Sequence, residues 1–235
     1  MPFVEVCLSP ALVSLHALPD KIVVVTDILR ATSCMVTALA HGVARIRPVR
    51  GVEECRAWQA KGLLAAAERD GQKVAGFDLD NSPFSYQNPA LQGKEIVVST
   101  TNGTQAINSA TEAAEVLIGA FLNLQSITDY LLAQQRDVLV LCSAWKNRPS
   151  LEDSLFAGAL VAALQPAYQV QDDAALMSAR LYQEATPKLL TTVQQGSHVQ
   201  RLQKLGIEAD IAFCLRHNEY AVLPALRGDC IENIQ

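Results

Sequence analysis

The sequence predicts an α/β protein: a largely parallel or mixed sheet covered by helices on both faces. Short apolar runs alternate with helical segments almost to the end of the chain. The run Lys21–Thr26 (KIVVVT) is rich in β-branched residues and continuously apolar, as expected of a strand buried on both faces. No repeat, charge block or linker interrupts the alternation, which favours parallel strands joined by crossover helices.

Length and composition are those of a folded α/β domain. The 235 residues are enough to bury a sizeable core without disulfides. Hydrophobic residues make up 50% of the chain and charged residues 18%, which excludes a disordered protein. We expect a single domain over residues 1–235, and the weakly periodic stretch 165–190 is the one candidate seam between two subdomains.

Net charge and cysteine content limit the classes of partner and the cellular compartment that we expect. Lys and Arg total 19 against 24 Asp and Glu, a net charge of −5, which gives no general attraction for nucleic acid or anionic lipid. The six cysteines form no CxxC pair, and neither a signal peptide nor a membrane-spanning run is visible. We expect a cytoplasmic protein that binds neither nucleic acid nor membrane, and a homodimer because homo-oligomers are common.

The N-terminal half supplies four strands and three helices. The expected strands are Phe3–Cys7, Lys21–Thr26, Val43–Val49 and Glu95–Ser99. The expected helices are Ala31–Ala40, Val52–Lys61 and Asn102–Ser109. Leu63–Glu68 fits either a strand or a helix. Phe77–Gly93 is rich in turn formers and predicts a long ordered loop.

The C-terminal half continues the alternation. Strands are expected at Val116–Gly119 and Asp137–Cys142. Helices are expected at Leu124–Ala133, Leu151–Leu164, Asp172–Glu184 and Ser197–Leu205. The tail alternates short strand-like pieces such as Tyr220–Pro224.

Four polar segments stand where these strands end or where the long loop begins. Ligands of open α/β sheets gather beyond the carboxyl ends of the strands. In the first segment, Asp27, Arg30 and Thr32 follow a buried strand, and an Arg fork suits phosphate or carboxylate oxygens. A local Asp27–Arg30 ion pair with Thr32 as a cap is the alternative.

The second and third segments supply oxygen atoms and amides. GFDLDNSP (76–83) contains Asp78, Asn81 and Ser82, which suit a hard cation such as Mg²⁺ or, alternatively, an ordinary capped turn. STTNGT (99–104) joins a strand to a helix. Its glycine and amides suit an oxyanion, although an N-cap with a turn explains the same residues.

The fourth segment runs from Cys142, the end of DVLVLC, to Asp153. Cys142 could be a nucleophile, or an inert buried thiol. Glu152 and Asp153 could hold a cation, or could cap the following helix. Together the four segments fit metal-assisted chemistry on a phosphate ester, in which a cation neutralises phosphate oxygens.

In this order, the motifs TDILRATS (26–33), GFDLDNSP (76–83), STTNGT (99–104) and CSAWKNRPSLEDSLFAG (142–158) resemble the 2-phosphosulfolactate phosphatase family. The resemblance covers most of the chain, including SHVQRLQKLG and the tail after it. It implies a Mg²⁺-dependent phosphatase that hydrolyses (R)-2-phospho-3-sulfolactate to 3-sulfolactate and phosphate, on the route to coenzyme M. The substrate would be a small phosphorylated anion.

Residue roles follow from the resemblance together with side-chain chemistry. The candidate catalytic residues are Asp27, Arg30, Cys142 and Asp153. The candidate metal ligands are Asp27, Asp78, Glu152 and Asp153. The candidate substrate-binding residues are Arg30, Thr32, Asn81, Ser82, Thr101, Asn102, Gly103, Thr104, Lys146 and Arg148, of which Lys146 and Arg148 would meet the sulfonate.

One stretch departs from the family pattern. Where the family has a small Gly-rich stretch after the cysteine, this chain has Ser143–Asn147, so another phosphorylated hydroxy acid is an alternative substrate. Two other readings stay open: a non-catalytic oxyanion-binding sensor, and a phosphate-transferring enzyme with Cys142 as nucleophile. None of the four histidines lies in the four segments, so we expect them to be structural or at the surface.

Overall fold

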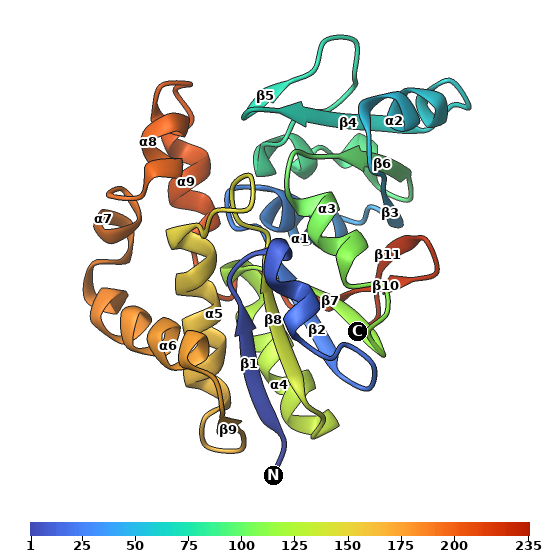
Figure 1. Cartoon of the computed structure of the whole chain (residues 1–235). Coiled ribbons are helices and arrows are strands. Elements are labelled where there is room, and N and C mark those ends of the chain that lie inside the picture. Colours follow the sequence, from blue (N-terminus) through green and yellow to red (C-terminus); the bar gives the residue numbers. More distant parts are fainter.

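Eleven strands form one mixed sheet in the computed structural model, which describes residues 1–235 (Figure 1). The strands are β1 Phe3–Cys7, β2 Ile22–Thr26, β3 Arg45–Pro48, β4 Leu64–Arg69, β5 Gln72–Lys73, β6 Glu95–Ser99, β7 Glu115–Gly119, β8 Val138–Cys142, β9 Gln169–Val170, β10 Pro224–Arg227 and β11 Cys230–Asn233. Their order is β5-β4-β6-β3-β11-β10-β7-β2-β8-β1-β9. The predicted α/β class is confirmed.

Helices connect most of these strands. They are α1 Ala31–Ala40, α2 Val52–Gln59, α3 Gly103–Ser109, α4 Leu124–Gln134, α5 Leu151–Leu164, α6 Asp173–Ala185, α7 Leu189–Val193, α8 Ser197–Gln203 and α9 Glu208–Cys214. Short 3-10 turns are η1 Pro10–Leu15, η2 Pro83–Gln87, η3 Pro89–Leu91, η4 Phe121–Asn123 and η5 Thr186–Lys188. No helix is both long and apolar enough to cross a lipid bilayer.

The sheet consists of two parallel blocks joined by a hairpin. Strands β7, β2, β8, β1 and β9 are parallel to one another, as are β4, β6 and β3. The C-terminal hairpin β10–β11 pairs antiparallel with β7 on one side and with β3 on the other. Strands β4 and β6 lie across the top of the molecule, above β1, β2 and β8 (Figure 1). Carboxyl ends from both blocks therefore reach one region.

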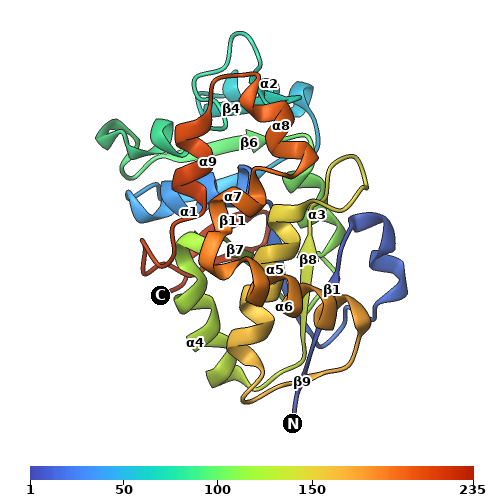
Figure 2. The same cartoon turned by 90° about the vertical axis from the view of Figure 1, so that its left-hand side faces the viewer.

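Strand β2 shows how the two faces are covered. All five of its residues are buried. Ile22 and Val24 belong to the core beneath α4 and α5, the face that Figure 2 shows in front. Val23 and Val25 belong to the core formed with α1 and α3. Burial on both faces explains why the run has no alternating polar residue.

The structure resolves one ambiguous segment and contradicts one predicted strand. The ambiguous segment Leu63–Glu68 is a strand, β4, because it pairs with β6. The prediction of a strand-like piece at Tyr220–Pro224 is wrong: the Tyr220 amide donates to the Leu122 carbonyl at 3.0 Å, and the strand begins at Pro224. The stretch 165–190 contains β9 and α6, which contact β1 and α5.

Candidate active site

The segments after β2, β6 and β8 meet with part of the 76–83 loop around one small cavity. Its volume is about 20 Å³, enough for roughly one water-sized particle. The lining residues come from six separate parts of the chain: Asp27, Leu29, Arg30, Glu68, Gly71, Asn81, Asn102, Trp145, His198 and Leu202. We call this the acidic cavity, because two of its lining side chains are carboxylates.

Asp27 occupies the turn between β2 and α1 and is 7% exposed. Its Oδ1 accepts the Ala31 amide at 3.3 Å. Burial raises the pKa of Asp27 to about 6, although the charge of His198 and the Ala31 amide act in the opposite direction. The carboxyl group therefore titrates close to neutral pH.

The hydroxyl of Thr32 is used inside the same turn. It donates to the Asp27 carbonyl at 2.9 Å and accepts the Asp27 amide at 3.0 Å. Thr32 is fully buried, so it fixes the backbone that carries the Asp27 carboxylate. Its predicted contact with substrate stays a prediction.

Asp153 joins the loops after β2 and β8. Its Oδ1 accepts the Ile28 amide at 2.9 Å, and its Oδ2 accepts the Ser143 hydroxyl and the Ala144 amide, both at 3.2 Å. Burial, followed by the nearby Glu152 and Asp27 charges, raises the pKa of Asp153 well above its usual range. With both oxygens engaged, Asp153 positions the loops around Asp27.

Glu152 makes the contact that sequence reasoning missed. Its Oε1 lies 2.5 Å from Nδ1 of His198 on α8, and its Oε2 is buried without a hydrogen-bond partner. The His198 ring stacks on Trp145, with ring centroids 5.3 Å apart. The expectation that all four histidines are structural or at the surface is therefore not supported for His198, which lines the cavity. The resemblance of SHVQRLQKLG was the one available signal.

Arg30 lines the acidic cavity but already has partners. Its guanidinium forms a buried ion pair with Asp210 of α9, and its Nη2 donates to the Gly71 carbonyl at 2.9 Å. Asp210 also accepts the Ser82 hydroxyl at 3.0 Å. Arg30 and Ser82 thus hold the 76–83 loop and α9 together through Asp210. Arg30 does not form the local ion pair with Asp27 that was the alternative prediction.

The STTNGT loop packs directly against Asp27. A Cβ atom on Gly103 would lie 2.6 Å from the Ala31 Cβ and 2.9 Å from Oδ2 of Asp27, so only glycine fits there. The Asn102 side-chain oxygen accepts the Lys146 amide at 3.2 Å. Thr104 is engaged with Thr100, since its amide donates to Oγ1 of Thr100 at 3.1 Å.

Glu68 is a second carboxylate that the sequence did not single out. It lies at the end of β4 and is 6% exposed. It accepts the Gly71 amide at 2.5 Å and the Thr101 hydroxyl at 3.2 Å. Thr101 therefore faces Glu68, and the two connect β4 with the loop after β6.

The loop 76–83 divides its polar residues between two places. Asn81 is 7% exposed and lines the acidic cavity. Asp78 is exposed, and its Oδ2 accepts the Ala65 amide at 2.8 Å and the Gln59 side chain at 3.0 Å. It lines a different cavity, beside Leu64 and Lys94. The structure therefore does not bring Asp78 to the other predicted metal ligands.

Cys142 is placed unfavourably for nucleophilic chemistry. It ends β8, is completely buried, and packs in the apolar core under α5. Burial, followed by the charge of Asp153, raises the pKa of the Cys142 thiol well above its usual range. A thiol that stays protonated and inaccessible is a poor nucleophile, which argues against the catalytic role assigned from the sequence.

The loop after Cys142 adopts a glycine-like backbone without glycines. Ala144, Lys146 and Asn147 have φ angles of 61°, 48° and 65°. Positive φ is costly for non-glycine residues, so the surrounding contacts must hold this loop in place. Trp145 and Arg148 exchange backbone hydrogen bonds of 2.8 and 2.9 Å. Lys146 and Arg148 line a second, larger cavity next to the acidic one.

The oxygen-rich donor set fits a hard cation that is completed by substrate and water. No three His, Cys, Asp or Glu side chains lie close enough together to hold a metal ion alone. Mg²⁺ is commonly bound by one or two carboxylates with waters and substrate phosphate, whereas zinc sites need at least three protein ligands. Asp27, Glu68 and Asn81 present oxygen atoms at the cavity, and the unpartnered Oε2 of Glu152 is close behind.

Comparison with known proteins points to one family. A sequence model described as 2-phosphosulpholactate phosphatase matches residues 7–229. A probable 2-phosphosulfolactate phosphatase of Caldanaerobacter subterraneus is 35% identical over 223 residues, 93% of this chain and 92% of that protein. Proteins of the same name from Thermotoga maritima and Microcystis aeruginosa are 39% and 36% identical, covering 86% and 92% of this chain and 88% and 92% of those proteins.

Proposed function

The chain belongs to the 2-phosphosulpholactate phosphatase family and is a phosphoric monoester hydrolase, and we propose that it converts (R)-2-phospho-3-sulfolactate to 3-sulfolactate and phosphate with Mg²⁺. The observation that carries the proposal is the buried carboxylate cluster around Asp27, which lies at the ends of strands from both sheet blocks. Membership in a family of phosphatases also favours catalysis over the non-catalytic sensor.

The cluster needs a compensating cation. Asp27 and Glu68 face the same cavity, with Glu152 and Asp153 behind them, and all four are buried. A phosphate dianion would be repelled by these groups. Asp27 and Asn81 would hold Mg²⁺ here, and the cation would supply the positive charge that neutralises the phosphate oxygens. The orphaned Oε2 of Glu152 supports such a cation, because a buried carboxylate oxygen without a partner is costly.

Asp27 is suited to accept a proton from the attacking water. With a pKa of about 6 it is mostly ionised at neutral pH, yet basic enough to share a proton in the transition state. Gly103 leaves room beside its Oδ2, and Thr32 fixes its backbone.

His198 is suited to donate a proton to the leaving oxygen. The Glu152 carboxylate oxygen, 2.5 Å from Nδ1, orients the ring, and Trp145 stacks against its face. Asp27 and His198 line the same cavity, so a proton acceptor and a proton donor are available together. Asp153 contributes by holding the loop after β2 against the loop after β8.

The natural substrate follows the family, with one alternative. The loop 143–147 keeps a glycine-like backbone through Ala144, Lys146 and Asn147 while adding the bulk of Trp145. This bulk lies at the wall of both cavities, where the part of the substrate beyond the phosphate would lie. Another phosphorylated hydroxy acid remains the second candidate because of it.

Phosphate release by the purified protein tests the proposal. The substrates are 2-phosphosulfolactate, 2-phospholactate and p-nitrophenyl phosphate, each with Mg²⁺ or with EDTA. We expect release with Mg²⁺, loss of activity with EDTA and recovery when Mg²⁺ is restored. Equal activity in EDTA and in Mg²⁺ would contradict the proposed role of the metal. If 2-phosphosulfolactate releases no phosphate while the other esters do, another phosphorylated hydroxy acid becomes the favoured substrate.

A further inference from the structure

A second cavity opens beside the acidic one and has the opposite charge. Its volume is about 410 Å³, and we call it the basic cavity. Its lining residues, none of which is a carboxylate, are Trp145, Lys146, Arg148, Pro149, Ser150, Leu151, Ser197, His198 and Arg201. Trp145 and His198 line both cavities, so together they form the wall between them.

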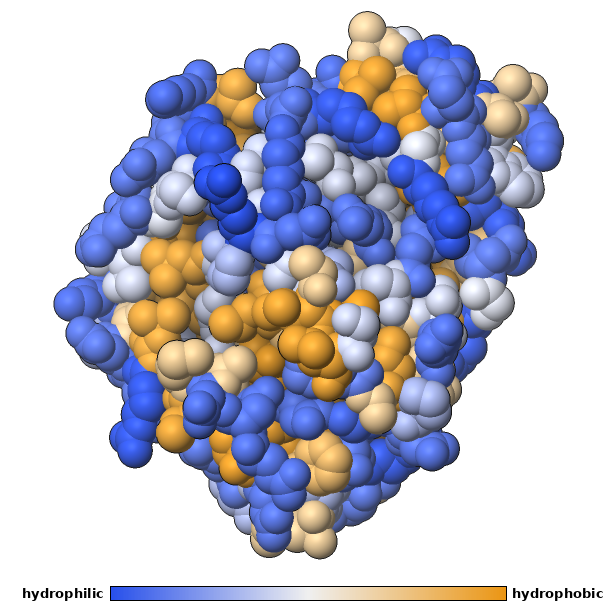
Figure 3. Space-filling view, viewed as in Figure 1, coloured by the Kyte–Doolittle hydropathy of each residue, from blue (hydrophilic) through white to orange (hydrophobic).

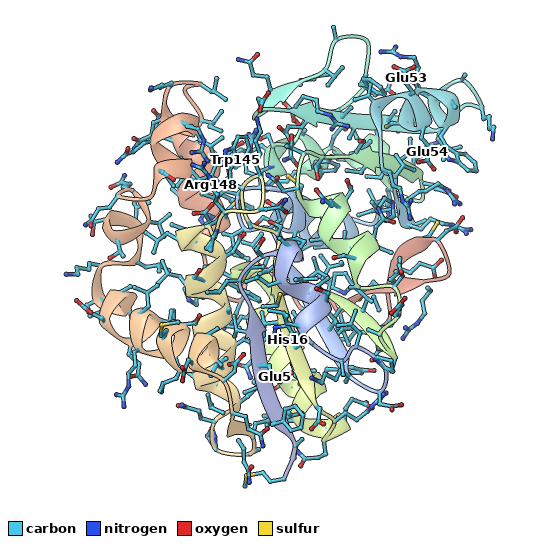
Figure 4. The ribbon with its side chains drawn as sticks, in the orientation of Figure 1. Glu5, His16, Glu53, Glu54, Trp145 and Arg148 are labelled. Carbon is cyan, nitrogen blue, oxygen red and sulfur yellow. The ribbon has the colours of Figure 1, made fainter.

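The basic cavity lies between the loop after β8 and helix α8. Figure 4 shows Trp145 and Arg148 side by side on that loop, next to α8. Hydrophilic side chains dominate the surface over this upper part of the molecule, and apolar ones gather lower on the same face (Figure 3). The basic cavity is thus a charged opening close to the carboxylate cluster.

Arg201 is the cation of this cavity whose buried nitrogen atoms lack a partner. Its Nε and Nη2 atoms are buried and make no hydrogen bond. The guanidinium packs over the Trp145 ring at 4.4 Å, which fixes its plane. Buried charged donors without acceptors are unfavourable, and a planar guanidinium fork matches the oxygens of a carboxylate or sulfonate. Arg201 is therefore oriented but unsatisfied.

The other two cationic side chains that line the basic cavity, Lys146 and Arg148, are more exposed than Arg201. The Lys146 ammonium pairs with Asp70 at 3.1 Å, and its side chain is 60% exposed. Arg148 is exposed at the rim, held through its backbone by Trp145. Both add positive potential, whereas Arg201 is half-buried, with two buried nitrogen atoms and a guanidinium that packs on Trp145.

We propose that the basic cavity binds an anionic group of the substrate other than its phosphate, and that Arg201 selects for that group. The inference rests on the proposed function, which puts the phosphate at the acidic cavity. A substrate that bears two strong anions would then extend past Trp145 and His198 from one cavity to the other. Simple phosphate esters lack the second anion and would gain nothing from the basic cavity, so Arg201 is a specificity-determining residue.

Selectivity measurements test this role. We would compare kcat/KM for 2-phosphosulfolactate with that for p-nitrophenyl phosphate in wild type, Arg201→Gln, Arg201→Lys and the control Arg180→Gln, an exposed residue of α6. Losing one charge-assisted contact should lower the ratio of the two values by about 10- to 100-fold in Arg201→Gln, through a higher KM for 2-phosphosulfolactate. Arg201→Lys should recover part of the loss, and Arg180→Gln should keep the ratio. An unchanged ratio in Arg201→Gln overturns the proposal.

A binding measurement tests the basic cavity independently of catalysis. Thermal unfolding is followed with 3-sulfolactate, which has the sulfonate and carboxylate but no phosphate, and with lactate, which has only the carboxylate. We expect 3-sulfolactate to raise the Tm of wild type and not of Arg201→Gln. A Tm that does not change in wild type, or that rises equally in both, overturns the basic-cavity assignment. If wild type binds 3-sulfolactate but releases no phosphate from any ester, the proposed function fails and the binding site stands.

Discussion

Nδ1 of His198 lies 2.5 Å from Oε1 of Glu152, and this contact joins α8 to the start of α5 beside Asp27. The two residues are 46 positions apart in the chain. The imidazole also forms the wall between the acidic and basic cavities. A single buried pair therefore connects the proposed proton chemistry with the proposed specificity site.

Replacing His198 should change both the rate and the pH dependence. The charge of His198 holds the pKa of Asp27 below the value that burial alone would produce. In His198→Gln that pKa rises, so the acidic limb of the kcat/KM profile should move to higher pH. Loss of a proton donor should also lower kcat by about 100-fold.

The matched control for His198 is His41→Gln, since His41 is exposed and bonded to Tyr220. Profiles of phosphate release between about pH 5 and pH 9 give the comparison. An acidic limb in His198→Gln that stays where it is in the wild type would contradict the coupling between His198 and Asp27.

The ionisation of Asp27 should destabilise the fold as pH rises. Its pKa is raised from 3.8 to about 6, so the folded state holds a proton that the unfolded state releases first. The free energy of unfolding of the wild type should then fall between about pH 4 and pH 6. Asp27→Asn lacks this ionisation and should gain up to about 3 kcal/mol relative to wild type over that range.

Urea unfolding in EDTA at a series of pH values measures this difference. The Asp27 charge also raises the pKa of Asp153, so Asp27→Asn relieves Asp153 as well, and the difference reports the ionisation of the Asp27–Asp153 pair. If the free energies of unfolding of wild type and Asp27→Asn depend on pH in the same way from pH 4 to pH 7, the pKa of Asp27 is not raised by burial.

Cys142→Ala should keep its activity. The thiol is completely buried and protonated, and no polar group of the substrate can reach it. We expect kcat/KM within about twofold of wild type and a loss of stability of about 1 kcal/mol from the missing sulfur. Steady-state kinetics and thermal unfolding measure the two effects. A folded Cys142→Ala protein with activity reduced 100-fold would instead support Cys142 as the nucleophile.

Gly103→Ala should damage the site through sterics alone. The new methyl would lie 2.6 Å from the Ala31 Cβ and 2.9 Å from Oδ2 of Asp27, so the loop must move. We expect a stability loss of about 1–3 kcal/mol and a large fall in kcat, because Asp27 is displaced.

Gly51→Ala is the control for Gly103→Ala. A Cβ there meets nothing within 4 Å, and its φ of −141° suits any residue. It should keep full activity and lose less than about 1 kcal/mol. Equal kcat for Gly103→Ala and wild type would show that the loop is not pressed against Asp27.

The sequence predicted the convergence of segments because strand ends are easily located. The β-branched run before Asp27 and the apolar run before Ser99 place the turns between strand and helix that carry Asp27 and the STTNGT loop. The joining of the two parallel blocks through the hairpin β10–β11 was not predictable, because this hairpin pairs with strands β7 and β3, which lie far away in the sequence. Two polar residues of the 76–83 loop were harder to place, because spacing within a turn-rich loop does not tell that Asp78 is exposed and that Asn81 lines the acidic cavity.

His198, Glu68 and Arg201 were missed for a different reason. Glu68 is a single residue near the end of a buried strand, and His198 and Arg201 lie in SHVQRLQKLG, which resembles the family but carries no recognisable site chemistry of its own. Their role appears only when α8 and β4 pack next to the loop after β8. Residues brought in by tertiary packing leave no local pattern, whereas turn glycines and strand ends do.

The central claim is that one buried carboxylate at the end of β2 is the reacting centre, and paired substitutions test it most directly. Phosphate release from 2-phosphosulfolactate would be measured for Asp27→Asn and for Asp78→Asn, the predicted ligand that the structure places outside the site. Asp27→Asn should lose at least about 100-fold in kcat, and Asp78→Asn should retain most of it. Comparable activity of Asp27→Asn and wild type, or an equal loss in Asp78→Asn, would contradict the assignment of the acidic cavity as the active site.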